Sequence, residues 1–331
     1  MPFVHLAACD RDRDVKKFWH ANFTAVEFHD DITARDHRAA VARLGRPDLY
    51  FAGFPCPTFS SAGSGRGVQD PRGEIIFHVI AFLKVALPKA FVLENVCGLL
   101  TNHPETLQWV LKELKAIGGK AYEIDAKVVN CNEHGLPQSR KRLWIVGRLK
   151  TKIVTQFQWP EPYGCVPLAP ILDKLVGTVG PQHAPPASQG TAQANLVKAF
   201  SEIGSLTKKN PCLVDAIVDI DGTKLHWMLD MSPCLTRHRC GIGGHWVTSR
   251  GRRLSTGEQL RLMGFKRSIM KVDSVTDRQL RLMIGNSCAV PVLERILLRL
   301  LPSVGLANDS AMKRRWESHA QATRSVADLK A

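Results

Sequence analysis

The sequence predicts an α/β fold in which helices cover both faces of a mostly parallel sheet. In the first half, short β-rich runs alternate with segments of helical periodicity. This alternation is typical of parallel strands joined by helical crossovers. The length of 331 residues and the hydrophobic fraction of 44% also allow a sizeable core without disulfide or metal staples.

The elements of the first half follow one another in a regular order. Strands are expected over residues 3–9, 48–54, 90–94, 121–129 and 142–146. Helices are expected over residues 12–23, 31–44, 74–87 and 104–117. Together they predict one doubly covered sheet.

The composition changes after Arg148. Prolines collect between residues 151 and 193, which indicates irregular structure at a domain boundary. Regularity returns at Ser255-Thr256-Gly257-Glu258, a capping-box pattern that opens a helix toward Met263. A last helix is expected over residues 291–301, closed by Pro302, and residues 308–331 read as a basic solvated helix or frayed tail.

The charge balance indicates a polyanionic partner. Lys and Arg number 45 against 30 Asp and Glu, which gives a formal net charge of +15. A surplus of this size suits nucleic acid better than an acidic or neutral small substrate.

The spacing of the cysteines and the length of the apolar stretches predict the cellular compartment of the protein. The nine cysteines are widely spread without a Cys-x-x-Cys pair, as expected for reduced thiols and not for a disulfide framework or zinc ribbon. The longest apolar stretch, residues 75–87, contains His78 and Lys84, and no secretory signal opens the chain. We expect an intracellular protein without a membrane span or metal site, nuclear if the source is eukaryotic.

The first chemistry-bearing stretch is Phe54-Pro55-Cys56-Pro57-Thr58-Phe59-Ser60, where a predicted strand ends. Catalytic groups gather at the carboxyl ends of strands in α/β sheets, and the flanking prolines fix the backbone of Cys56. Taken alone, a cysteine at this place is more often a small buried hydrophobe. With suitable neighbours, its thiol can act as a nucleophile.

Two further stretches supply those neighbours. The apolar strand ending in Glu94 should bring a carboxylate to the same edge, where partial burial would raise its pKa and let it donate a proton. The run from Gln138 to Arg142 would place Gln138, Arg140 and Arg142 on one strand face. The alternatives without a catalytic role are that Glu94 caps a turn and that the run from Gln138 to Arg142 is a solvated basic edge strand.

These stretches resemble the DNA cytosine-5 methyltransferase family. Phe54-Pro55-Cys56 with Phe59-Ser60, Glu94-Asn95-Val96 and Gln138-x-Arg140-x-Arg142 occur in the family's order. Later motifs agree: Arg253-Leu254-Ser255 with Glu258, Arg261-Leu262 and Gly264-Phe265, and then Gly285-Asn286-Ser287. The resemblance covers most of residues 5–148 and 232–301 and implies a Rossmann-like sheet that uses S-adenosylmethionine.

The resemblance also implies a mechanism and its residues. Cys56 would attack C6 of a flipped cytosine in DNA, Glu94 would protonate N3, and Arg140 and Arg142 would hold the base. The cofactor would lie near Asp10, Asp31, Ile32, Pro55, Ile75, Asn286 and Ser287. DNA would be contacted by Ser60, by Arg66 in a mobile glycine-rich loop, and by Gln138, Arg237 and Arg239.

The implied organisation has three parts. Residues 1–148 and 275–302 would form the catalytic domain, 149–274 the target-recognition region and 303–331 a basic tail. The family's opening strand, which ends in Phe-x-Gly-x-Gly, has no counterpart here, so a truncated gene model, a partner supplying that strand or an inactive relative are the explanations. Pro57 also replaces the family's usual Gln or Asn.

Two other functions remain open. A few relatives methylate tRNA with the same residues, and the sequence separates the two substrates poorly. A non-catalytic nucleic-acid-binding relative would explain the missing strand, although Cys56, Glu94, Arg140 and Arg142 together oppose it. A Cys-His hydrolase is a distant third, because no histidine occupies a comparable motif position.

Overall fold

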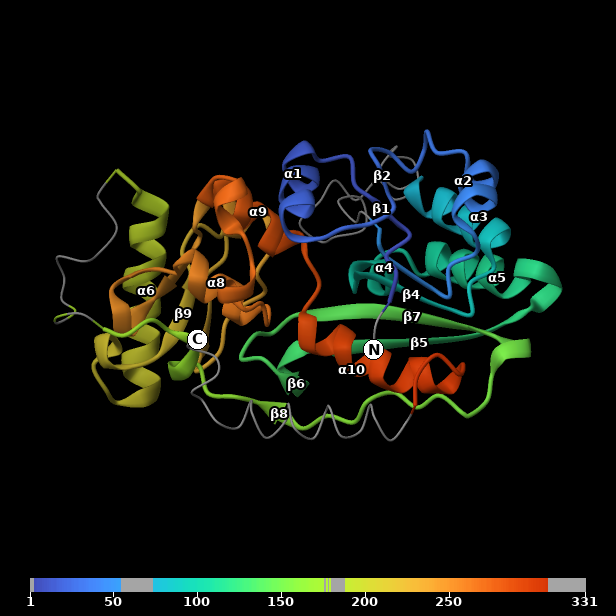
Figure 1. The fold of residues 1–331 in the computed structure, drawn as a ribbon. Coiled ribbons are helices and arrows are strands. Elements are labelled where there is room, and N and C mark those ends of the chain that lie inside the picture. The colour runs from blue at the N-terminus through green and yellow to red at the C-terminus, as the bar shows by residue number, and fades with distance from the viewer. Residues whose placement is uncertain (1–2, 55–73, 176, 178, 180–187, 309–331) are drawn as a thin grey trace. The chain divides into compact units, whose positions relative to one another are not determined.

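The computed structural model describes residues 3–54, 74–175, 177, 179 and 188–308. Within them the chain forms two compact units (Figure 1). The first comprises the N-terminal region to Val129, Lys141–Glu161 and a segment that begins at Leu293. The second comprises Asn130–Arg140 and Pro162–Val292.

The first unit is an α/β structure, as the sequence predicts. Its strands are β1 (Ala7–Cys9), β2 (Glu27–His29), β3 (Leu49–Gly53), β4 (Ala90–Val96), β5 (Tyr122–Asn130) and β7 (Lys141–Leu149). Its helices are α1 (Arg13–Asn22), α2 (His37–Leu44), α3 (Ile75–Ala86), α4 (Gly98–Thr101), α5 (Pro104–Lys120) and α10 (Val290–Ser303).

The main sheet of this unit has the strand order β3-β4-β7-β5 and is mixed, so the expectation of a mostly parallel sheet was wrong. β3 and β4 are parallel, whereas β7 runs antiparallel to β4. Phe91 and Leu93 of β4 alternate with Val92, and all three are fully buried, so apolar groups cover both faces of the strand. The helices α3 and α5 pack against each other over the core that contains Phe91 and Leu93 (Figure 1).

A second, smaller sheet pairs β1 with β2 in parallel. Among the described strands, β1 therefore has one partner, and β3 has β4 alone. The sequence of β3, Leu-Tyr-Phe-Ala-Gly, is as apolar as that of a central strand, yet Phe51 is 40% exposed. One edge of β3 is thus open within the described part of the chain.

The second unit is built on an antiparallel sheet. The strand order is β10-β9-β11-β12, and β6 and β8 form a separate parallel pair. The strands are β6 (His134–Gly135), β8 (Gly164–Cys165), β9 (Ala216–Asp219), β10 (His226–Leu229), β11 (His245–Val247) and β12 (Arg252–Arg253). The helices are α6 (Gly190–Thr207), α7 (Arg237–Ile242), α8 (Thr256–Leu262) and α9 (Asp277–Asn286).

Some element boundaries differ from the sequence predictions. The helix expected over residues 31–44 begins at His37, because the Asp36 side chain accepts from the amides of Arg38 and Ala39 and caps it there. Pro302 lies inside α10, one residue before the helix ends, so its missing amide does not close the helix at residue 301. α6 lies in a region where no helix was predicted.

Candidate active site and nucleic-acid interface

The strand ends of the first unit position Glu94. In the parallel register Gly53 of β3 is paired with Glu94 of β4. A Cβ atom on Gly53 would lie 3.6 Å from Oε2 of Glu94, so the carboxylate rests against the last residue of β3. Phe54 follows and is buried. The strand that leads in sequence toward Cys56 therefore ends beside a carboxylate.

Arg142 holds this carboxylate from the other neighbouring strand. Val96 is paired with Arg142 in the antiparallel β4–β7 register, and Nε of Arg142 lies 3.2 Å from Oε1 of Glu94. Each side chain is only 13% exposed. Nη1 of Arg142 also donates to the carbonyl oxygen of Lys141. A charge pair this shielded from water is stronger than one on the surface, so Arg142 orients Glu94.

Asn95, next to Glu94, is a polar residue of the same motif to which the sequence analysis assigned no role. Its side chain is 2% exposed, and its Oδ1 accepts from the amide of Val96. Among the described residues Nδ2 has no hydrogen-bond partner. Buried donors are rarely left unpaired, so Nδ2 is a candidate to donate a hydrogen bond to a bound ligand near the end of β4.

Gln138 and Arg140 do not continue the strand that contains Arg142. β7 begins at Lys141, and Gln138 instead forms an isolated bridge with Ser232 in the second unit. The expected shared strand face is therefore wrong. The physical reason is that Gln138 is fully buried, where its amide donates to Leu262 O and accepts from Leu235 N. Its role as a DNA contact stays a prediction.

Arg140 is buried within the second unit, where its guanidinium group binds three backbone carbonyl oxygens. Its side chain donates to the carbonyl oxygens of Leu235 and Gly285 through Nη1, and to that of Ser287 through Nη2. The residue is 3% exposed, and among the described residues its Nε has no partner. Arg140 thus fixes the loop before α7 and the end of α9, and still has one donor unused.

Gly285-Asn286-Ser287 forms the carboxyl end of α9. A Cβ atom on Gly285 would lie 2.4 Å from the carbonyl oxygen of Thr236, so only glycine allows α9 to approach the start of α7 this closely. Ser287 caps the helix, and its Oγ donates to Ile284 O. Asn286 is exposed.

The predicted cofactor residues of the first unit gather at the ends of β1 and β2. Asp10 follows β1, and its Oδ1 accepts from the amide of Asp12. Asp31 follows β2 and accepts from Thr33, and the hydrogen bond from the Thr33 amide lowers the pKa of this carboxyl. Desolvation by the surrounding protein raises the pKa of the Cys9 thiol to about 11, and the charges of Asp10 and Asp31 act in the same direction.

Ile32 and Ile75 supply apolar surface in the same unit. Both side chains are partly buried and pack against the main core cluster. Carboxylates that can accept hydrogen bonds from hydroxyl groups, together with apolar side chains, suit a nucleoside. The predicted residues Pro55, Cys56, Ser60 and Arg66 lie outside the described residues.

The basic segment of the second unit is largely paired with carboxylates. Arg239 Nε lies 3.0 Å from Asp219, and Arg253 Nη1 lies 3.0 Å from Asp221. Arg250 Nη1 lies 3.3 Å from Asp215. Arg239 therefore has a structural partner, while Arg237 is exposed on α7. The DNA contacts assigned to these two arginines stay predictions.

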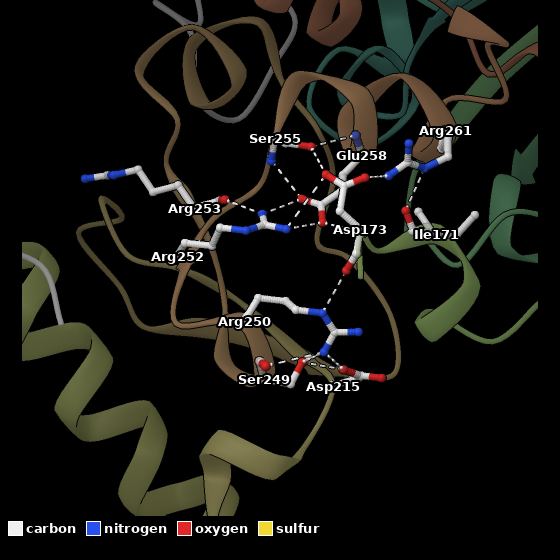
Figure 2. A network of polar contacts seen from close by, with 10 residues as sticks. All are labelled: Ile171, Asp173, Asp215, Ser249, Arg250, Arg252, Arg253, Ser255, Glu258 and Arg261. Atoms are coloured by element: carbon white, nitrogen blue, oxygen red, sulfur yellow. Dashed lines mark hydrogen bonds and ion pairs between the residues drawn. The ribbon is translucent and has the colours of Figure 1, made fainter. Parts of the chain in front are cut away.

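A further network joins the proline-rich segment to α8 (Figure 2). The fully buried carboxylate of Glu258 accepts from both terminal nitrogens of Arg252, at 2.8 Å each. It also accepts from the amides of Ser255 and Asp173. The predicted capping box is thus confirmed, and Asp173, which the sequence did not reveal, extends it.

Within the described ranges, no group of three or more His, Cys, Asp or Glu side chains is arranged to hold a metal ion. The helices of the same ranges include none with the length and apolar character needed to span a bilayer.

Comparisons with known proteins agree with this architecture. The chain is 30% identical over 302 residues to Type II methyltransferase M.HaeII of Haemophilus aegyptius, covering 89% of this chain and 85% of that protein. It is 32% identical over 286 residues to Type II methyltransferase M.NgoBI of Neisseria gonorrhoeae, covering 86% and 81%.

Solved structures show the same fold at low sequence identity. The S. pombe Dnmt2 methyltransferase matches with a TM-score of 0.58 at 18% identity, covering 91% of this chain and 92% of that one. The Entamoeba histolytica methyltransferase EhMeth matches with a TM-score of 0.57 at 16% identity, covering 93% and 100%. A sequence model of one family matches residues 1–301. The chain belongs to the C-5 cytosine-specific DNA methylase family.

Proposed function

We propose that this chain transfers a methyl group from S-adenosylmethionine to C5 of a cytosine flipped out of DNA. The observation that carries the proposal is the placement of Glu94 against the end of β3, the strand that leads in sequence to Cys56. Family membership supplies the reaction class, and the formal net charge of +15 favours a polyanionic substrate.

The proposed reaction begins with the thiolate of Cys56, which forms a bond to C6 of the cytosine ring. Glu94 donates a proton to N3 and so disperses the charge that the attack places on the ring. C5 would then form its bond to the methyl group while the bond from that group to the sulfonium sulfur of the cofactor breaks. Transfer of the C5 proton to water would re-form the double bond between C5 and C6, break the bond between C6 and the cysteine sulfur and release the Cys56 thiolate, and N3 would return its proton to Glu94.

Arg142 and Arg140 have different proposed roles. Arg142, 3.2 Å from Glu94, keeps this side chain oriented toward the base. Arg140 is fixed by three carbonyl oxygens, and its unpaired Nε can donate to the substrate. The base must leave the duplex, because the reacting atoms are inaccessible within the stack.

The cofactor residues of the first unit fit the proposed group. Asp10 would accept hydrogen bonds from the ribose hydroxyl groups, Asp31 and Ile32 would contact the adenine, and Ile75 would lie beside it. Asn286, Ser287 and Pro55 would contact the rest of the molecule. When bound, S-adenosylmethionine supplies the electrophilic methyl group.

We assign each segment of the chain the role that the sequence predicts for it. Residues 1–148 and 275–302 would carry the chemistry, and residues 149–274 would contact the DNA target, with 303–331 as a basic tail. Ser60, Arg66, Gln138, Arg237 and Arg239 are the proposed DNA contacts.

We also propose that a partner chain supplies a strand to the open edge of β3. Phe51 is exposed there, although apolar strands of a parallel sheet are normally buried on both faces. The test is calorimetry of S-adenosylmethionine binding with and without a peptide strand ending in Phe-x-Gly-x-Gly. Binding that requires the peptide supports the proposal, and full binding by the chain alone overturns it.

The reaction is tested by transfer of a labelled methyl group to DNA and, in parallel, to tRNA. Cys56→Ser should reduce transfer to background and leave DNA binding largely intact. Cys165→Ser, an exposed cysteine in the second unit, is the matched control. Glu94→Gln should lower kcat roughly 10²- to 10⁴-fold. Activity retained by Cys56→Ser, or transfer to tRNA alone, would overturn the proposal.

A further inference from the structure

Arg267 carries a positive charge that has no carboxylate partner among the residues that the structure describes. It lies in the short turn Arg267–Ile269 after α8, and its side chain is exposed. No ion pair or hydrogen bond joins its guanidinium to any residue in the described part of the chain. The neighbouring arginines of the same unit, such as Arg252 and Arg253, do have carboxylate partners.

Arg267 borders a solvent-open polar cavity of about 460 Å³. The first turn of α8, the turn that follows this helix, and α9 all contribute to its wall. The residues that matter here are Asp173, Gly257, Arg261, Arg267, Asp277 and Arg281. All belong to the second unit, so the cavity is complete within one compact body.

Two guanidinium groups converge in this cavity. Nη1 of Arg261 lies 3.4 Å from the position that a Cβ atom on Gly257 would take, and Nη1 of Arg267 lies 4.0 Å from it. Arg261 is held rigidly, since its Nε donates to Ile171 O at 2.7 Å and its Nη2 pairs with Asp173. Its Nη1 has no partner among the described residues, so it is a prepositioned donor.

The two carboxylates of the cavity wall already have partners. Asp173 pairs with Arg261 and also accepts from Ser255 Oγ at 2.7 Å. Asp277 accepts from Thr256 Oγ1 and lies 3.4 Å from Nε of Arg281. Three arginines thus face two aspartates, and Arg267 is the surplus cation. The wall therefore carries one net positive charge, and the two guanidinium groups attract an anion to the space between them.

We propose that this cavity binds one backbone phosphate of the nucleic acid. Guanidinium groups match the geometry of phosphate oxygens and form charge-assisted hydrogen bonds with them. Gly257 has no side chain, so the point on which Arg261 and Arg267 converge stays open. The inference rests on the proposed function, which supplies DNA as the polyanion.

The salt dependence of DNA binding tests the site. The full chain is titrated onto a labelled duplex at several salt concentrations, and log K is plotted against log salt. Each lost phosphate contact makes the slope less steep by about 0.9. Arg267→Gln should show that change and weaker binding, with an unaltered unfolding temperature. Arg278→Gln, an exposed arginine of α9 outside the cavity, removes the same charge and should not change the slope.

A second variant separates geometry from charge. Gly257→Ala places a methyl group between the two Nη1 atoms without altering net charge, and it should weaken DNA binding as Arg267→Gln does. Stabilisation by inorganic phosphate is measured alongside. An unchanged slope for Arg267→Gln, or an equal effect of Arg278→Gln, would overturn the proposal. Loss of phosphate stabilisation without any effect on DNA would assign the site to free phosphate and overturn the nucleic-acid assignment.

The outcomes separate this inference from the proposed function. A wild-type chain that binds DNA through Arg267 but transfers no methyl group would refute the reaction and leave the phosphate site standing. An active enzyme whose Arg267→Gln variant keeps the full salt slope would refute the site alone.

Discussion

His245 should make folding stability depend on pH. It lies in β11 opposite Asp219 of β9, which is itself paired with His226 of β10. The side chain is 1% exposed, and neither ring nitrogen has a hydrogen-bond partner among the described residues. Burial lowers the pKa of His245 to about 4, and the nearby charge of Arg239 acts in the same direction.

The sign and size follow from this pKa. An unfolded histidine titrates near 6.5, so below that pH the unfolded state binds a proton that the folded state does not bind until the pH approaches 4. Stability is therefore lost as pH falls from about 6.5 toward 4, and the loss between about pH 7.5 and pH 5 amounts to ~2 kcal/mol. Burial raises the pKa of Asp219, which opposes this trend because its folded carboxyl binds protons more readily.

His245→Leu isolates the histidine, because Asp219 is present in both proteins. Replacing a ring without hydrogen bonds by an apolar side chain should cost little at neutral pH. Urea unfolding followed by tryptophan fluorescence gives the free energy of unfolding at the two pH values. Between them, the variant should lose ~2 kcal/mol less of this free energy than the wild type. His238→Leu, an exposed residue of α7, is the control and should lose as much as the wild type. Equal losses in wild type and His245→Leu would refute the reasoning.

Two further changes probe packing in the second unit. Gly285→Ala should destabilise by about 1–3 kcal/mol in urea unfolding, because the added methyl group would lie 2.4 Å from Thr236 O. Gly204→Ala in α6, whose new contact is an ordinary 3.6 Å, should be neutral or stabilising and is its control. Glu258→Gln should cost about 2–3 kcal/mol, below the full penalty for breaking a buried pair because the Arg252 side chain is 37% exposed. An unchanged urea midpoint would contradict either prediction.

Local sequence signals were sufficient where neighbouring residues decide the structure. The strands expected over residues 48–54 and 90–94 correspond to β3 and β4, because apolar runs bounded by turns need a sheet to bury both faces. The capping box at Ser255 and Glu258 formed as expected, since its hydrogen bonds span only three residues. The same local pattern placed Glu94 at the end of its strand, but β4 continues for two more residues, to Val96, because β7 pairs with it there.

Long-range contacts explain what the sequence did not reveal. α6 has a short buried stripe of small and branched residues whose partner, Val218, belongs to a strand that was not predicted. Gln138 leaves the expected strand because its amide contacts backbone groups of Leu235 and Leu262, roughly a hundred residues away. No local pattern carries that information, because tertiary hydrogen bonding overrides strand propensity.

The same distinction applies to charge. A formal net charge of +15 predicts a polyanionic partner, but composition cannot say which cations the fold neutralises. In the dense basic run of the second unit, Arg239, Arg252 and Arg253 all have carboxylate partners brought from elsewhere in the chain or from the next helix. Arg267, which has no carboxylate partner among the described residues, lies outside that run. A phosphate contact should therefore be sought where the fold leaves a cation unpaired beside a cavity, and not where arginines are most frequent in the sequence.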